Sequence, residues 1–247
     1  MALFEAHNLH LRFGDRVVLE NVSLAFEAGR LSGIMGPNGA GKTTCFNVLT
    51  GRYKPDRGQV LLDGRDITGR PPQEIVGLGV ARSFQVMSLF DEFTVFENVA
   101  IALPATRFRG GDPLGQAYAD PALVAEAHDV LDKVGLAAQA DQPAKSLSYG
   151  ARRALEIGVA LACRPKLLFL DEPTAGLGSD GRARLADLVR SLKGNVTLVI
   201  IEHDMQFLFS LADTISVIHW GQVIARGTPA ELKRNPWVQS SNLGRLN

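Results

Sequence analysis

The most informative part of the sequence is Gly36-Pro37-Asn38-Gly39-Ala40-Gly41-Lys42-Thr43-Thr44. It matches the pattern G-x-x-x-x-G-K-[ST], in which a glycine-rich turn joins a strand to a helix. An apolar stretch from Leu31 to Met35 precedes it, and a helical stretch through Leu49 follows it, so the pattern stands in the context that it requires. The alternative is a glycine-rich turn that only connects a strand to a helix.

This stretch has the chemistry of a phosphate-binding loop. Glycines let successive backbone N–H groups converge on phosphate oxygens, and the start of the following helix favours negative charge. We expect the Lys42 ammonium to reach the β- and γ-phosphates of a nucleotide and the Thr43 hydroxyl to ligate Mg²⁺. The predicted nucleotide-binding residues of the loop are Gly36, Pro37, Asn38, Gly39, Ala40, Gly41, Lys42, Thr43 and Thr44.

A pair of carboxylates follows a second apolar strand. Leu167 to Leu170 is apolar throughout, and Asp171 and Glu172 come directly after it, at the carboxyl edge where parallel sheets bind ligands. We expect Asp171 to hold Mg²⁺, directly or through water, and Glu172 to orient or deprotonate an attacking water. The alternative is an acidic turn that caps a helix before Pro173.

The remaining pattern is that of an α/β protein. Residues 3–27 are expected to form short strands with alternating apolar and polar residues, and Gly58 to Thr68 a hairpin. The strand at 167–170, a helix, and a second strand at Val196 to Ile201 have the spacing of a parallel crossover. We therefore predict an α/β core with a mixed sheet and an N-terminal antiparallel β region.

A helical lobe interrupts this core. Thr94 and Glu97 form a capping box, and Asp120-Pro121 is a second helix start, with a loop rich in Gly and Pro expected between Pro104 and Asp120. Thr228 to Glu231 is expected to cap a last short helix. We predict a single domain, 1–247, with the core at 1–87 and 162–247 and the lobe at 88–161.

Composition excludes several classes of protein. The chain has 247 residues with 26 Lys+Arg against 26 Asp+Glu, and 46% of its residues are apolar, which disfavours both disorder and a generally basic nucleic-acid binder. No apolar stretch approaches the ~20 residues of a membrane span, and the N-terminus lacks the pattern of a signal peptide. Cys45 and Cys163 are expected to be buried, reduced thiols, which suits a cytosolic protein.

Further motifs, taken with the phosphate loop, resemble the ATP-binding subunits of ABC transporters. Leu147-Ser148-Tyr149-Gly150-Ala151 is similar to the family signature LSGGQ, and the Asp171-Glu172 strand follows it. Gln85 lies where the family has its Q-loop glutamine, and Ile201-Glu202-His203-Asp204 contains the switch histidine. Phe13 matches the aromatic residue that stacks on adenine. The resemblance runs in order along essentially the whole chain and implies a P-loop ABC ATPase.

The resemblance implies a role for each of these residues. Glu172, His203, Gln85 and Lys42 would be catalytic, with His203 at the γ-phosphate, and Thr43, Gln85 and Asp171 would hold Mg²⁺. Ser148 and Gly150 would bind ATP held by a second ABC ATPase subunit, in a homodimer or heterodimer with two sites.

Each of these residues also has a structural alternative. A lone histidine after an apolar strand is more often structural, an amide at a strand end is usually surface, and Phe13 also suits a core position. Arg152-Arg153 is expected to be a solvated helix face.

Finer features resemble the branched-chain amino acid branch of the family, notably GPNGAGKTTCFNVLTG at 36–51 and IEHDM at 201–205. This implies a MgATP hydrolase at the cytoplasmic face of the inner membrane that powers solute uptake through two transmembrane permease subunits, with an external solute-binding protein and no nucleic acid. The alternatives are the relatives for urea uptake or lipopolysaccharide export, a non-transport ABC ATPase that acts on nucleic acid or ribosomes, and an ATP-binding regulator without turnover.

Three departures from the family pattern stand out. Ala151 replaces the usual glutamine, so the helix that starts after Ser148 loses the reciprocal half of a capping box. Gly178 replaces the aspartate that usually ends the D-loop, from which we expect slower hydrolysis or asymmetric use of the two sites. The stretch 104–120 is short for the branched-chain branch, from which we expect different partner contacts.

Overall fold

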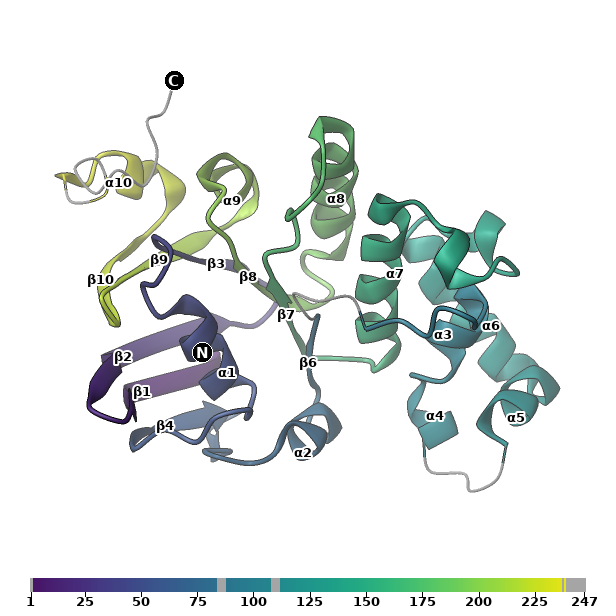
Figure 1. The fold of residues 1–247 in the computed structure, drawn as a ribbon, viewed down its shortest axis with the longest axis horizontal. Helices are drawn as coiled ribbons and strands as arrows, with labels where there is room; N and C mark the ends of the chain where they lie inside the picture. Colours follow the sequence, from purple (N-terminus) through teal and green to yellow (C-terminus); the bar gives the residue numbers. More distant parts are fainter. Residues whose placement is uncertain (1, 84–87, 108–111, 237, 239–247) are drawn as a thin grey trace.

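The fold is taken from a computed structural model that describes residues 2–83, 88–107, 112–236 and 238. Two sheets and the helices packed on them form one half of the molecule, and a group of helices forms the other (Figure 1). Among the described residues, no helix has both the length and the apolar character needed to cross a bilayer.

The N-terminal sheet is antiparallel, as predicted, and has the strand order β2-β1-β4-β5. Its two long strands have 12 residues each, where the sequence predicted several shorter ones, and they meet at the turn after Phe13. Register shifts along their pairing let apolar residues return to the buried face. The strands are β1 (Ala2–Phe13), β2 (Arg16–Glu27), β4 (Arg57–Leu62) and β5 (Arg65–Asp66).

The second sheet is mixed and carries the predicted phosphate loop and carboxylates. Its strand order is β10-β9-β3-β8-β7-β6, in which β10 runs antiparallel to β9 and the other pairs are parallel. The carboxyl ends of β3 and β7 therefore lie at the same edge of the sheet. The strands are β3 (Leu31–Met35), β6 (Val80–Arg82), β7 (Leu167–Asp171), β8 (Thr197–Ile201), β9 (Thr214–His219) and β10 (Gln222–Gly227).

The space between the two sheets is filled by α1 (Lys42–Leu49) and by aromatic side chains. The Phe169 ring packs edge-on against Phe4 at 5.6 Å, Phe26 at 6.1 Å and Phe46 at 5.8 Å between ring centroids. Alternate residues of β7 thus belong to different cores, because Leu168 and Leu170 pack on the opposite face. This explains why the strand is apolar throughout.

The opposite face of the mixed sheet is covered by helices (Figure 1). Leu185 and Val189 of α8 (Ser179–Leu192), and Leu208 of α9 (Met205–Leu211), belong to the core on this face. Two short helices complete this half of the molecule: α2 (Pro72–Gly77) and α10 (Pro229–Lys233), whose capping box between Thr228 and Glu231 is as predicted.

The helical lobe begins at the predicted cap. Thr94 Oγ1 accepts from the Glu97 N–H at 3.0 Å, and Glu97 Oε2 accepts from the Thr94 N–H at 2.7 Å. Asp120 caps the next long helix, with Pro121 at its first position, also as predicted. The helices of the lobe are α3 (Val95–Ala100), α4 (Pro104–Arg107), α5 (Pro113–Ala119), α6 (Pro121–Lys133) and α7 (Tyr149–Ala162).

The prediction of a loop from Pro104 to Asp120 is wrong, because α4 and α5 lie there. The Thr106 hydroxyl is buried and donates to backbone carbonyls of the preceding turn, at 2.7 Å to that of Leu103. Ala117 is fully buried in the core of the lobe. Tertiary packing therefore outweighs the glycines and prolines that made the stretch look irregular.

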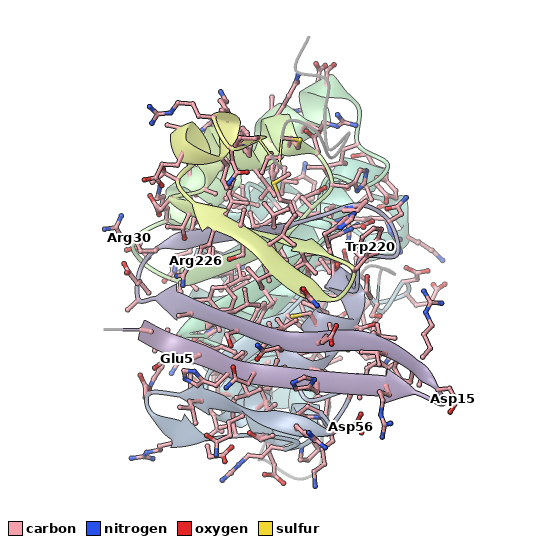
Figure 2. The ribbon with its side chains drawn as sticks, turned by 90° about the vertical axis from the view of Figure 1, so that its left-hand side faces the viewer. Glu5, Asp15, Arg30, Asp56, Trp220 and Arg226 are labelled. Carbon is pink, nitrogen blue, oxygen red and sulfur yellow. The ribbon has the colours of Figure 1, made fainter. Side chains whose placement is uncertain are left out.

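The β9–β10 hairpin joins the two sheets (Figure 2). The Arg226 guanidinium on β10 donates to the Ala25 carbonyl of β2 at 2.8 Å. At the tip, the Gly221 N–H donates to the Ala40 carbonyl at 2.9 Å, and the Gly221 carbonyl accepts from the Glu20 N–H at 2.8 Å. The hairpin thus bonds to the phosphate loop at Ala40 and to the N-terminal sheet at β2.

The two cysteines have different environments. Cys45 is buried, as predicted, and burial raises the pKa of its thiol to about 12. Cys163 is half-buried, at the end of α7, so the prediction of a buried thiol is wrong there. The division of a single domain, 1–247, into a core at 1–87 and 162–247 and a helical lobe at 88–161 stays a prediction.

Candidate functional site

The phosphate loop connects β3 to α1, as its pattern predicts. A Cβ atom at Gly36 would lie 2.1 Å from the Ile218 carbonyl oxygen, so only glycine allows β9 to approach this closely. Gly41 caps α1 with a φ of 99°, in the left-handed region, and a Cβ atom there would lie 2.9 Å from the Val18 carbonyl. Close backbone contacts therefore explain why the two fixed positions of the pattern, Gly36 and Gly41, are glycines.

The Lys42 side chain reaches back to the start of the phosphate loop and is almost fully buried. Its ammonium donates to the Gly36 carbonyl at 2.8 Å and the Pro37 carbonyl at 3.0 Å. Burial lowers the pKa of Lys42, while the nearby carboxylates of Glu172 and Asp171 act to raise it. A phosphate group would compete with these carbonyls for the ammonium.

A pocket of about 390 Å³ opens above the loop. It brings most of the predicted loop residues together with Phe13 and Glu172. The Phe13 side chain is 48% exposed and forms a T-shaped pair with Tyr53, with 5.4 Å between ring centroids, so about half of its surface is open to solvent. The pocket is lined by Phe13, Arg16, Val18, Asn38, Gly39, Gly41, Lys42, Thr43, Thr44 and Glu172.

Arg16 is a residue that the sequence reasoning missed. It lies at the start of β2, across the turn from Phe13, and it lines the same pocket. The sequence could have indicated it, because Arg16 is a basic residue three positions after Phe13 and the turn between them brings both to one end of the hairpin. A guanidinium is a suitable partner for phosphate oxygens.

Asp171 ends β7 and is buried, with 4% of its surface exposed. Its Oδ1 atom has no hydrogen-bond partner among the described residues. Burial, and next the charge of Glu172, raise the pKa of Asp171 to about 6. A buried carboxylate oxygen without a partner is costly, and a bound cation would satisfy it.

The donor set fits Mg²⁺. The Asp171 carboxylate and the Thr43 hydroxyl provide hard oxygen ligands, and Mg²⁺ usually takes one or two protein ligands together with phosphate and water oxygens. Within the described ranges, no group of three or more His, Cys, Asp or Glu is arranged to hold a metal. Gln85, the third predicted ligand, lies outside the residues that the structure describes.

Glu172 follows in an unusual backbone conformation. Its φ is 45°, in the left-handed region that non-glycine residues rarely adopt, and its N–H donates to the Ile201 carbonyl of β8 at 2.8 Å. Such strain costs about 1–3 kcal/mol and is typical of functional sites. The His203 Nδ1 atom lies 3.7 Å from Glu172 Oε1, so the structure brings these two predicted residues together.

Glu202 holds the segments of Glu172 and His203 together, a role that the sequence reasoning missed. Its side chain is fully buried and accepts four hydrogen bonds. Two come from the N–H and hydroxyl of Thr174, at 2.8 and 2.5 Å, and two from the N–H groups of His203 and Asp204, at 3.1 and 3.4 Å. The available signal was an acidic residue that directly continues a fully apolar strand.

Ser148 and Gly150 lie at the start of α7, away from the phosphate loop. Ser148 caps the helix by accepting from the Ala151 N–H at 3.4 Å, and Ala151 has no side chain to complete a capping box, as predicted. Both residues line a pocket of about 540 Å³ between the lobe and α8. Among the described residues, none lines both this pocket and the pocket at the phosphate loop.

The prediction of a solvated face at Arg152-Arg153 is wrong for Arg153, which is among the largest fully buried side chains. Arg153 projects from α7 toward the end of β7, where it contacts the Glu172 carbonyl, and it pairs with Glu156. Arg152 is half-buried and pairs with Asp91 at 2.5 Å.

Comparisons with known proteins agree with this arrangement. The family model of the ABC transporter matches residues 19–175. The LivG branched-chain amino acid transport ATP-binding protein of Salmonella typhimurium is 39% identical, and BraF of Pseudomonas aeruginosa is 40% identical, each over 98% of both chains. The lipopolysaccharide export ATP-binding protein LptB of Acidithiobacillus ferridurans is 32% identical over 98% of this chain and 97% of its own.

Solved structures are similar over nearly the whole chain. The ADP conformation of MJ1267, an ATP-binding cassette of an ABC transporter, has a TM-score of 0.86 and 32% identity over 99% of both chains. The cbiO1 subunit of Clostridium perfringens has a TM-score of 0.83 and 26% identity over 94% of this chain and 90% of its own. Together with the phosphate loop and with α7, which begins at the signature-like stretch 147–151, these similarities show that the chain belongs to the ABC transporter family, as one of its ATP-binding subunits.

Proposed function

We propose that this chain binds and hydrolyses MgATP and thereby drives uptake of branched-chain amino acids, or of a similar small polar solute, through separate membrane subunits. The observation that carries the proposal is the pocket in which the phosphate loop, Phe13 and Glu172 share one lining. The cargo is supported by identities of 39% and 40% to LivG and BraF, which extend over 98% of each chain.

The residues of the pocket have distinct roles in this proposal. Lys42 and the loop amides bind the phosphates, and the half-exposed Phe13 ring stacks on the adenine. Thr43 and Asp171 would hold Mg²⁺, which when bound neutralises charge on the phosphate oxygens. Gln85 is the proposed third ligand.

Glu172 is the proposed general base for the attacking water. Its carboxylate lines the pocket, and the nearby His203 imidazole is the proposed contact to the γ-phosphate. A strained backbone held by β8 supports this role, because it fixes the carboxylate before substrate arrives.

A second ATPase subunit completes each site in this proposal. Ser148 and Gly150 present a helix start, which favours anions, yet they line a different pocket from the phosphate loop of their own chain. A head-to-tail dimer, of two identical or two related subunits, brings the signature of one chain to the ATP of the other. ATP then closes the dimer, and hydrolysis with phosphate release reopens it.

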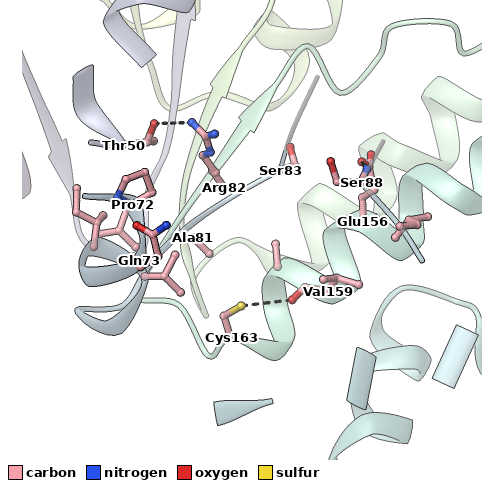
Figure 3. A pocket seen from close by; sticks show the side chains of 15 residues that line it. Thr50, Pro72, Gln73, Ala81, Arg82, Ser83, Ser88, Glu156, Val159 and Cys163 are labelled. Carbon is pink, nitrogen blue, oxygen red and sulfur yellow. Dashed lines mark hydrogen bonds between the residues drawn. The ribbon is translucent and has the colours of Figure 1, made fainter. Parts of the chain in front are cut away.

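The groove between α2, β6 and α7 is the proposed docking site for a membrane subunit (Figure 3). It has a volume of about 290 Å³ and a mostly apolar lining that includes Ile75, Val76 and Val159. Ser88 and Leu89 also line it. Next to it, Phe90 is 55% exposed and stacks on Phe93. An amphipathic helix of a permease fits such a surface and would hold the chain at the cytoplasmic face of the inner membrane.

A related transport system is the second candidate. The 32% identity to LptB, over 98% of this chain, supports a lipopolysaccharide export ATPase, and urea uptake is a further alternative within the family. The higher identities to LivG and BraF favour branched-chain amino acids. We propose no nucleic-acid partner.

Affinity purification from gently solubilised native membranes tests this function. We expect the tagged chain to retain a pair of multi-span permeases and a sister ATPase, and a co-purifying solute-binding protein would identify the cargo class. A Phe90→Asp variant is expected to lose the permeases while keeping ATP turnover. Recovery with ribosomes or nucleic acid, and without membrane proteins, would contradict the proposal.

A further inference from the structure

Arg153 and Glu156 form a buried ion pair on α7. Their side chains are 2% and 5% exposed, and Arg153 Nη1 donates to Glu156 Oε2 at 2.7 Å. Arg190 and Asp187 on α8 have the same three-residue spacing and the same distance of 2.7 Å, but their side chains are 52% and 76% exposed. Burying a charged pair costs desolvation free energy, and apolar residues of similar volume are often as stable in its place.

One end of this pair contacts the proposed catalytic residue. Arg153 Nη2 donates to the backbone carbonyl of Glu172 at 3.4 Å. The carbonyl belongs to the residue whose φ of 45° lies in the left-handed region. The guanidinium therefore contacts the peptide group that directly follows the Cα atom of this strained residue.

The other end of the pair reaches the groove. Glu156 Oε1 accepts from the Ser88 N–H at 3.2 Å, and both residues line the groove (Figure 3). Ser88 is the first described residue after 84–87, the segment that contains Gln85. Among the described residues, a chain of contacts thus runs from the groove through Glu156 and Arg153 to the Glu172 backbone.

We propose that Arg153 and Glu156 are positioning residues, which couple the occupancy of the groove to the backbone conformation of Glu172. A helix that seats in the groove and moves Ser88 shifts Glu156, and the guanidinium transmits this shift to the Glu172 carbonyl. The buried pair suits this role because its hydrogen bonds fix three segments, from α7, β7 and the residues after 84–87, in one geometry. The inference rests on the proposed function, because it concerns residues that position Glu172 as the general base of ATP hydrolysis.

An apolar replacement separates positioning from stability. The double variant Arg153→Met/Glu156→Leu keeps the volume and removes both charges. Lys166→Met/Asp63→Asn is the control at an exposed ion pair, because neither residue lines the phosphate-loop pocket or the pocket of Ser148 and Gly150. In the purified full chain, we expect kcat for MgATP to fall about tenfold in the buried double variant, with the Kd for MgATP within about twofold of wild type. The melting temperature is expected to stay at or above the wild-type value, and the control to keep the wild-type kcat.

Hydrogen exchange provides a second readout. We expect MgATP to change amide exchange in the peptide 88–93 of the wild type and the control, and this response to disappear in the buried double variant. A wild-type kcat together with a wild-type exchange response would overturn the proposal.

Two results differ from a failure of the proposal: a double variant that does not fold, and a wild-type chain without ATP turnover. If the double variant does not fold, Arg153→Lys decides by the same kcat criterion, because it keeps the charge but loses the forked geometry. If the wild-type chain itself does not hydrolyse MgATP, the proposed function fails, and this outcome differs from a wild type that turns over and variants that match it.

Discussion

One continuous stretch, Gly36 to Thr44, forms the phosphate loop, whereas Glu172 depends on residues from three other segments. Its N–H bonds to the Ile201 carbonyl of β8, its carbonyl accepts from Arg153 of α7, and its carboxylate lies near His203. The loop geometry is local, since it follows from glycines and a helix start. The geometry around Glu172 exists only once the sheet and α7 have packed together.

This difference predicts that substitutions in the two regions act differently. Changes in the loop should remove nucleotide binding, because the phosphates contact the loop directly. Changes around Glu172 should leave binding intact and slow turnover, because they alter the position of a group that acts only during the reaction. The following variants test this separation.

Lys42→Ala should have the largest effect on binding. It removes the ammonium that would contact the phosphates, and hydrogen bonds to charged groups contribute about 1.5–3 kcal/mol each, so we expect MgATP affinity to fall at least about tenfold. Isothermal titration of the full chain measures the affinity. Lys166→Ala is the control, because this lysine pairs with Asp63 on the surface. Unchanged affinity in Lys42→Ala would count against the phosphate loop.

Glu202→Gln should slow turnover and spare binding. Glutamine has one acceptor oxygen where the carboxylate has two, so its NH₂ group faces either the Thr174 donors or the N–H groups of His203 and Asp204. The donors that face the NH₂ group lose their acceptor. We expect kcat to fall about tenfold with an unchanged Kd, since an unsatisfied buried donor costs about 1–3 kcal/mol.

Thr174→Val tests the same network with a smaller change. It removes the hydroxyl donor but keeps the Thr174 N–H, so its effect on kcat should be weaker than that of Glu202→Gln. Glu126→Gln, at the half-buried carboxylate that pairs with Arg164, is the control. A drop in affinity as large as the drop in kcat would break the proposed separation between binding and positioning.

Ala151→Gln should restore the capping box of α7. The glutamine would accept from the Ser148 N–H, while Ser148 already accepts from the N–H of residue 151. We expect a gain of about 0.5–1 kcal/mol, which raises the melting temperature by roughly 1–4 °C for a chain of this size. In the double variant Ser148→Ala/Ala151→Gln the gain should vanish. An unchanged melting temperature in Ala151→Gln would exclude the capping explanation.

Gly178→Asp should have the smallest effect. Gly178 is the N-cap of α8 without a side-chain bond, and its φ of −71° and ψ of 179° suit aspartate. A Cβ atom there would meet no atom of the described residues within 4 Å. Replacing a glycine cap by aspartate adds a few tenths of a kcal/mol. If Gly178 slows hydrolysis, kcat should also rise, by about twofold; an unchanged kcat would remove that hypothesis.

The local parts of the fold were predictable from the sequence. The capping boxes at Thr94 and Thr228, the strand before Asp171 and the strand–turn–helix at the phosphate loop follow from short patterns, and the structure has all of them. Each depends on residues within a few positions of one another, so one sequence is enough.

The remaining features depend on contacts between distant segments. Arg153 looks like a surface residue by type, and only the packing of α7 against the end of β7 makes it buried. The helices between 104 and 120 form because Thr106 and Ala117 are buried against α3 and its neighbours, although glycines and prolines surround them. The role of Glu202 could not be predicted, because it depends on a hydrogen bond from Thr174, which is distant in the sequence.

The most direct test of the proposed function measures binding and hydrolysis of MgATP by the purified wild-type chain and by Glu172→Gln. Removing a general base costs about 10²–10⁴ in rate, so we expect ADP formation to fall by that factor in Glu172→Gln while the Kd for MgATP stays at the wild-type value. An equal rate in the two proteins, or a wild-type chain that binds MgATP without forming ADP, would contradict the assignment of Glu172 and the proposed function.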